Sequence, residues 1–224
     1  MEVFDLSMTM QPMWRWKLET KLVMDVKQED PYRVTAINTS MHAFTHIDTP
    51  LHIEPERESI DQVNLERLCG PAAVIDLTPV LPNQKIGREY LEKRAHHLKT
   101  GDIVLLKTCW DMQRAYTSRE YWLEAPFLSK DASRWLADQP IKAVGFDFPQ
   151  DYVIREIPGR HPHPAEMPTH DLILRKGVLL IEYLCNLETI KSPRVEIYAL
   201  PLKVGGAEGG CARVVAIDRK NDTQ

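Results

Sequence analysis

The chain has 224 residues and a formal net charge of −4 at pH 7, from 28 Lys plus Arg against 32 Asp plus Glu. With 43% hydrophobic and 27% charged residues, it has the composition of a globular protein, which excludes a disordered one. The mild acidity and the lack of a basic segment argue against nucleic acid as a partner. No apolar run approaches the roughly 18 residues that a membrane span needs. We therefore expect one domain over residues 1–224 that binds neither nucleic acid nor a membrane.

The cysteines indicate the compartment. Cys69, Cys109, Cys185 and Cys211 are isolated, with no C-x-x-C pair. Disulfide frameworks are typical of shorter, cysteine-dense secreted chains, so we expect reduced thiols that pack inside the protein. Residues 1–5 also carry acids where a signal peptide has lysines. Both observations predict a cytoplasmic protein.

Taken in chain order, short runs rich in Val, Ile and Tyr predict strands. The predicted strands cover residues 32–38, 73–77, 103–107, 143–146, 178–181, 195–200 and 213–217. Several of them are continuously apolar, as expected of strands that are buried on both faces of a sheet.

Two helices are predicted between these strands. Residues 88–98 place apolar side chains at helical spacing, and Gly101 follows as a stop signal. Residues 129–138 begin with Ser129, a favourable N-cap, and carry apolar residues on one face. Because strands outnumber helices, we expect an α/β domain with a largely covered sheet.

A proline-dense stretch over residues 156–168 predicts an extended loop. It is either a plain surface connection or a lid over a site. His161 and His163 lie in it and are candidates to contact a substrate if the loop is a lid.

The most informative segment is residues 42–52, which contains three of the eight histidines of the chain. His42, His46, Asp48 and His52 form the pattern H-x3-H-x-D-x3-H. Pro50 and the β-branched residues around it oppose a helix, and in an extended chain the four even-numbered side chains leave one face until Pro50 bends the path. Neutral imidazole and carboxylate groups are ligands that Zn²⁺ and similar metals prefer. The pattern predicts a metal site; the alternative is a polar sheet face whose histidines are hydrogen-bonded.

A second cluster lies downstream. Glu182 ends the apolar run 178–181, where a carboxylate is costly unless it is paired or bound to a metal. His170 precedes it by twelve residues. The alternatives are a glutamate that turns to solvent at a strand end and a histidine in a surface loop.

These segments together resemble the cyclase-like metal-dependent hydrolase family, which includes bacterial kynurenine formamidases and isatin hydrolases. The family motif H-x-G-T-H-x-D-x-P-x-H corresponds here to HAFTHIDTPLH at residues 42–52. Blocks at residues 5–7, 101–106, 145–147, 177–182, 186–187, 200–206 and 213–217 match in the same order along nearly the whole chain. The resemblance implies a swivelling β/β/α domain with a mixed sheet and covering helices, assembled as a homodimer or homotetramer.

The resemblance also implies a ligand set for one or two divalent ions, Zn²⁺ or Mn²⁺. A first ion would be bound by His42, His46 and Asp48, and a second site would be completed by His170 and Glu182. Asp48 and Glu182 would both be able to bridge the two ions.

The remaining site residues follow from the same resemblance. His52 would be the general acid/base, and an aromatic residue near the N-terminus would line the substrate pocket, with Trp14 the first choice and Trp16 the second. Both tryptophans are equally explained by core or interface packing. The one departure is Phe44, which stands at the motif glycine. Either the loop is held differently in this chain, or Phe44 narrows the pocket and stacks on the substrate.

We therefore expect a hydrolase that acts on the C–N bond of a small, aromatic amide or lactam, in the manner of an arylformamidase. Cyclisation or dehydration of another carbonyl compound is a second expectation, because the same metal site serves it. A catalytically silent metal- or ligand-binding protein is the third, and the presence of His52 argues against it.

Overall fold

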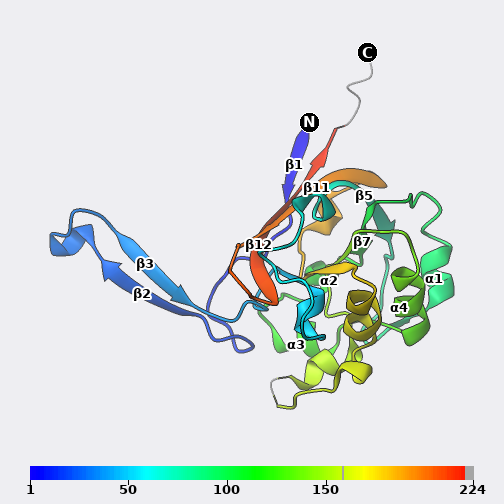
Figure 1. Ribbon diagram of the computed structural model, residues 1–224, viewed down its shortest axis with the longest axis horizontal. Helices are drawn as coiled ribbons and strands as arrows, with labels where there is room; N and C mark the ends of the chain where they lie inside the picture. The colour runs from blue at the N-terminus through cyan, green and yellow to red at the C-terminus, as the bar shows by residue number, and fades with distance from the viewer. Residues whose placement is uncertain (158, 220–224) are drawn as a thin grey trace.

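The computed structural model describes residues 1–157 and 159–219, and its centre is an eight-stranded mixed sheet (Figure 1). The strand order is β1-β12-β11-β5-β7-β9-β10-β4, and β4 also pairs with β12, so seven strands close into a ring. These strands are β1 (Glu2–Asp5), β4 (His46–Asp48), β5 (Cys69–Asp76), β7 (Ile103–Lys107), β9 (Ala143–Phe146), β10 (Leu179–Glu182), β11 (Arg194–Pro201) and β12 (Gly209–Asp218). β1 continues the sheet beside the far end of β12. The predicted α/β class with a mixed sheet is confirmed.

The four central strands run parallel, in the order β5, β7, β9, β10. Their side chains alternate between two cores: Ile103 and Leu105 face one apolar cluster, and Val104 and Leu106 face the other. This double burial explains the continuous apolar runs seen in the sequence. Because parallel strands end at a common edge, the last residues of these strands, Glu182 among them, lie along one edge of the sheet.

The helices are short and lie on one side of the sheet, where their buried side chains join the apolar cluster that contains Val104 and Leu106 (Figure 1). They are α1 (Arg88–Glu92), α2 (Trp110–Gln113), α3 (Arg119–Leu123) and α4 (Lys130–Ala137). The helix predicted over 129–138 is confirmed: the Ser129 side chain accepts a hydrogen bond from the Ala132 amide at the start of α4. The helix predicted over 88–98 is wrong in its length, because α1 ends at Glu92. Beyond it the chain continues in tighter turns that bring His97 Nε2 within 3.0 Å of the Val74 carbonyl.

Two smaller ribbons complete the fold. β6 (Lys85–Ile86) pairs with β8 (Phe127–Leu128). β2 (Glu19–Met24) pairs with β3 (Val34–Asn38) to form a hairpin that extends away from the body of the molecule (Figure 1). We call this hairpin the arm; every residue of its two strands except Met24 is exposed.

All four cysteines are free, as predicted, but only Cys185 is buried; Cys69, Cys109 and Cys211 are partly exposed, so the prediction that the cysteines pack inside is wrong for these three. Among the described residues, no helix has the length and apolar character that crossing a membrane would require.

Candidate metal centre

The centre of the site is the pairing of β4 with β10. His46 and Asp48 alternate with Ile47 on β4, so their side chains leave the same face, as predicted. Glu182 stands directly opposite His46 in the register. His46, Asp48 and Glu182 are all at most 2% exposed, so the alternative of a solvent-facing glutamate is wrong.

His42 and His52 join this group from the two ends of β4. The extended chain covers only His46–Asp48: His42 lies in the turn before it, and His52 lies in a 3-10 turn, Pro50–His52, that Pro50 opens. The path therefore bends on both sides of β4 and brings the two rings together, with centroids 4.0 Å apart in a stacked arrangement. The bend at Pro50 was predicted, whereas the prediction of an extended chain is wrong for His42, although all four side chains meet.

His170 reaches the same centre from a π-helical turn, His170–Leu174, and is 3% exposed. Its Nε2 lies 3.1 Å from Glu182 Oε1 and 3.6 Å from Asp48 Oδ2. The alternative of a surface-loop histidine is wrong. His163, in contrast, is engaged in its own turn, where its Nδ1 accepts a hydrogen bond from the Ala165 amide.

The tautomers of two buried histidines indicate a cation site. The Nδ1 atom of His46 lies 2.8 Å from the Phe44 carbonyl, and the Nδ1 atom of His170 lies 2.7 Å from Asp151 Oδ2. A carbonyl and a carboxylate oxygen both accept hydrogen bonds, so each Nδ1 donates and each Nε2 is directed inward, where it can offer a lone pair to a metal ion in place of a proton. In the metal-free protein burial opposes the charge of His170, but the carboxylates of Glu182, Asp151 and Asp48 raise its pKa well above the usual value. Hydrogen bonds of this kind orient histidines that bind metals.

These inward lone pairs face carboxylates. His46 Nε2 lies 3.2 Å from Asp48 Oδ1 and 3.6 Å from Glu182 Oε2, yet His46 Nε2 and Asp48 Oδ2 are buried without a hydrogen-bond partner. Lone pairs of nitrogen and oxygen repel one another at these distances unless a proton or a metal ion lies between them. The residues present therefore fit a divalent metal ion.

The donor atoms form two sets that share one carboxylate. One set is His42, Asp48 and His52, and the other is His46, Asp48 and Glu182; within each set the candidate ligand atoms lie within 4.8 Å of one another. Asp48 is the residue common to both sets, and the bridging role that the resemblance implies for it stays a prediction. The geometry also puts His52 among the candidate ligands, whereas the sequence led us to expect an acid/base there.

The pKa values of the two stacked histidines, His42 and His52, are shifted in opposite directions. Burial alone would lower the pKa of His42, but the carboxylates of Asp48 and Glu208 raise it to about 9. Burial lowers the pKa of His52 to about 4, and the neighbouring His42 and His170 act in the same direction against Asp48. His52 is therefore a neutral imidazole at pH 7, able to accept a proton.

Glu208 was missed by the sequence analysis. Its Oε1 lies 2.9 Å from His42 Nε2, while His42 Nδ1 lies 2.8 Å from Asp48 Oδ1, so two carboxylates fix the ring. Glu208 comes just before β12, and the next residue, Gly209, pairs with Asp48. A Cβ atom at Gly209 would lie 2.7 Å from the Ile47 carbonyl oxygen, so the close approach of β12 requires a glycine.

An aromatic cluster adjoins the centre. Phe44 adopts φ 59°, the left-handed conformation that the motif glycine suggests, and its side chain is 1% exposed. The Trp16 ring lies 5.0 Å from that of Phe44 and 5.4 Å from that of Tyr183, and Tyr183 in turn lies 5.3 Å from His46. Trp14, the first choice from the sequence, instead packs under the Arg119 guanidinium at 4.7 Å.

Known proteins share this sequence pattern and fold. The family described as putative cyclase matches residues 4–150. The kynurenine formamidase of Salinibacter ruber is 25% identical over 230 residues, covering 97% of this chain and 98% of that protein. The kynurenine formamidase of Bacillus thuringiensis is 26% identical over 182 residues, covering 81% of this chain and 78% of that protein.

Two solved structures give the same result at the level of the fold. Isatin hydrolase A from Labrenzia aggregata, solved with benzyl benzoate, has a TM-score of 0.80 at 20% identity, over 96% of this chain and 93% of its own. A potential metal-dependent hydrolase with cyclase activity has a TM-score of 0.69 at 29% identity, over 98% of this chain and 99% of its own. Since the family match spans more than half of the residues, the chain belongs to the putative cyclase family.

Proposed function

We propose that this protein is a metal-dependent hydrolase that cleaves the C–N bond of a small amide or lactam. The observation that carries the proposal is the set of inward lone pairs: His46 Nε2 faces the carboxylates of Asp48 and Glu182 in a buried site. The kynurenine formamidases and the isatin hydrolase to which the chain is similar support the choice of a C–N bond.

The residues of the site have different roles in this proposal. One or two divalent ions, Zn²⁺ or Mn²⁺, would be held by His42, His46, Asp48, His170 and Glu182, and they would supply Lewis acidity and lower the pKa of water from 15.7 to about 7. Asp151 and the Phe44 carbonyl keep His170 and His46 in the ligating tautomer.

His52 is the proton carrier in this proposal. It is neutral at pH 7, as a general base must be, but a pKa of about 4 makes the ring a weak base that requires a water acidified by the metal. In this proposal it accepts a proton from that attacking water. It then returns the proton to the leaving nitrogen. Its ring stacks on His42 at 4.0 Å, which fixes its direction beside the ligand set.

We further propose an aromatic substrate, which the cluster of Trp16, Phe44 and Tyr183 beside His46 supports. Matched aromatic and aliphatic formamides test this preference. A higher kcat/KM for the aromatic compound is expected, and equal values would remove the preference.

The reaction itself is tested with N-formylkynurenine. Protein loaded with Zn²⁺ or Mn²⁺ is expected to turn it over at about 1–10³ s⁻¹, and a chelated sample is expected to be inactive. Metal binding without turnover would move the search to lactams and to cyclisation or dehydration of other carbonyl compounds. If the protein bound metal but turned over none of these compounds, the alternative of a catalytically silent binding protein would be favoured.

We propose that the arm assembles a homodimer or homotetramer. A two-stranded ribbon is marginal in water by itself, and this one exposes apolar side chains on both faces. Leu22, Val23, Val26, Val34 and Ile37 are between 36% and 59% exposed. A second copy of the chain is the occupant we propose for these faces. We also propose a cytoplasmic location, which the four free cysteines support.

Light scattering at micromolar concentration tests the assembly. The wild-type protein is expected to be at least a dimer, and V23K/I37K is expected to be smaller, because two charges would be buried at the contact. L81K, at a residue that is 69% exposed outside the arm, is the matched control. A wild-type monomer, or equal effects of arm and control variants, would contradict the proposal.

A further inference from the structure

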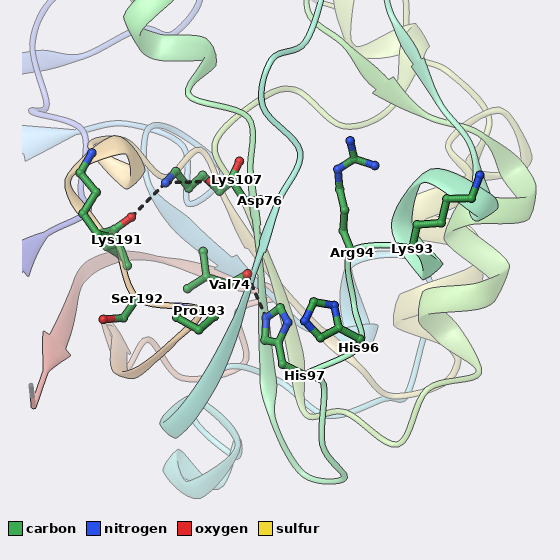
Figure 2. Close-up of a pocket in the computed structure, with 11 residues that line it drawn as sticks. Val74, Asp76, Lys93, Arg94, His96, His97, Lys107, Lys191, Ser192 and Pro193 are labelled. Atoms are coloured by element: carbon green, nitrogen blue, oxygen red, sulfur yellow. Dashed lines mark hydrogen bonds and ion pairs between the residues drawn. The ribbon is translucent and has the colours of Figure 1, made fainter. Parts of the chain in front are cut away.

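A cavity lies outside the metal centre and contains none of its residues (Figure 2). It forms where β5 continues beyond its pairing with β11: Ala73 is the last paired residue, and Val74 and Asp76 border the cavity instead. The opposite sides are built by residues 93, 94, 96 and 97, after α1, and by residues 190–193, before β11. Its volume is about 310 Å³, at the lower end of the range for small-molecule sites.

Basic side chains dominate its lining. They are Lys93, Arg94, His96, His97, Lys107 and Lys191. Asp76 is the one carboxylate of the lining, in a chain whose net charge is −4. This concentration of positive charge is opposite to the balance of the whole molecule.

Lys107 is a buried cation at the base of this group. Its side chain is 9% exposed, and its Nζ lies 2.9 Å from the Ile190 carbonyl and 3.1 Å from Asp76 Oδ2. Asp76 also accepts hydrogen bonds from the amide and the hydroxyl of Thr78. The single carboxylate is therefore already engaged and is not free to neutralise the other cations.

Those other cations have no carboxylate partner within residues 1–157 and 159–219. Lys191 Nζ donates to the Glu188 carbonyl at 2.6 Å, and the Arg94 guanidinium lies 3.7 Å from the centre of the Tyr90 ring. Lys93 forms no ion pair in this part of the chain. Figure 2 shows Arg94 and Lys93 on one side of the cavity and Lys107 with Lys191 on the other.

His97 adds a buried polar atom without a partner. Its Nε2 lies 3.0 Å from the Val74 carbonyl, so this nitrogen carries a proton. Its Nδ1 is buried and makes no hydrogen bond to any described residue.

We propose that this cavity binds the phosphate group of a small phosphate monoester. The cations that surround the cavity, Lys93 and Arg94 on one side and Lys191 on the other, attract an anion, and a charge-assisted hydrogen bond from any of them to a phosphate oxygen is about twice as strong as a neutral one. The cavity is larger than one phosphate needs, and Val74, Ile190 and Pro193 provide an apolar wall for the organic part. The site is independent of the hydrolase activity proposed above, since the two share no residue.

Binding is tested on the full chain without metal, so that phosphate does not sequester an ion. Glycerol 3-phosphate, inorganic phosphate and glycerol are titrated at constant ionic strength, with calorimetry and the ring Cε1–H signals of the histidines as readouts. The signals of His96 and His97 are expected to shift saturably with both phosphate compounds and not with glycerol, while those of His46 and His170 stay in place. Tighter binding of the ester than of free phosphate is expected.

The variant K93A/K191A removes one exposed lysine from each side and is expected to weaken binding at least about tenfold with an unchanged melting temperature. K85A/K130A is the matched control, with the same charge change at a cavity that also holds Asp131 and Asp138. The proposal would be overturned if the histidine signals showed no saturable shift, because the cavity would then bind no phosphate. It would also be overturned if both variants weakened phosphate binding equally, because the attraction would then come from the general positive charge of the surface. Binding of free phosphate alone would overturn the assignment to an ester.

Discussion

At the scale of single residues, Phe44 combines two opposing contributions. Its left-handed φ of 59° costs about 1–3 kcal/mol, whereas its buried ring stabilises the fold. Phe44→Ala is expected to lose about 3–5 kcal/mol of unfolding free energy. Phe44→Gly is expected to be more stable than Phe44→Ala by about 1 kcal/mol, because glycine accepts the positive φ. Urea unfolding measures both, and an alanine variant as stable as the glycine variant would show that the backbone is unstrained.

His52 and Asp48 separate catalysis from metal binding. His52→Ala is expected to lower kcat by about 10²- to 10⁴-fold and to retain the metal, because the ring is proposed to move protons. Asp48→Ala is expected to lose the metal too, since both donor sets share this carboxylate. Metal content and kcat are measured on the same preparations. If His52→Ala loses its metal, His52 is a ligand, which its place in one donor set permits.

At the scale of elements, the site depends on how closely β12 approaches β4. Gly209→Ala is expected to destabilise the protein and to weaken metal binding, because the new Cβ would lie 2.7 Å from the Ile47 carbonyl oxygen and 3.1 Å from His42 Cε1. Gly205→Ala is the control, since nothing lies within 4 Å of its Cβ position. Thermal unfolding and a metal titration give the two readouts. If the two variants unfolded at the same temperature and bound metal equally, β12 would be able to shift away from β4 without a loss of stability.

The elements also show what sequence reasoning can reach. The strands Ile103–Lys107 and Ala143–Phe146 have the predicted bounds, because buried β-branched runs are a local signal. The length of α1 was not predictable, because the chain leaves the helix to place His97 against Val74, 23 residues away.

The ligand residues near β4 were found because four chemistry-bearing side chains fall within eleven residues. Glu208 and Asp151 were not, because their contacts to His42 and His170 join residues 166 and 19 positions apart. Neither residue has a local pattern that marks it. Such supporting contacts depend on the closed ring of strands, which no single segment encodes.

At the scale of the whole molecule, the metal centre lies where the ring closes, since β4 pairs with both β10 and β12. A ligand that joins side chains from these segments stabilises the folded state by mass action. At a free metal concentration of 100 Kd, the unfolding free energy is expected to rise by about 2.7 kcal/mol. Asp48→Ala is expected to show little of this gain.

The metal-induced rise in unfolding free energy is expected to depend on pH because of His42. Burial lowers its pKa, but Asp48 and Glu208 raise it above the unfolded value of 6.5 to about 9. The protonated His42 ring therefore stabilises the metal-free protein. This stabilisation is complete below pH 6.5 and is lost as the pH rises through 9. A metal ion must displace the same proton, so its apparent affinity falls about tenfold per pH unit below that pKa. Thermal unfolding at a fixed metal concentration is therefore expected to show a metal-induced stabilisation that grows from pH 6.5 to 9; a constant increment across this range would mean that His42 binds no metal.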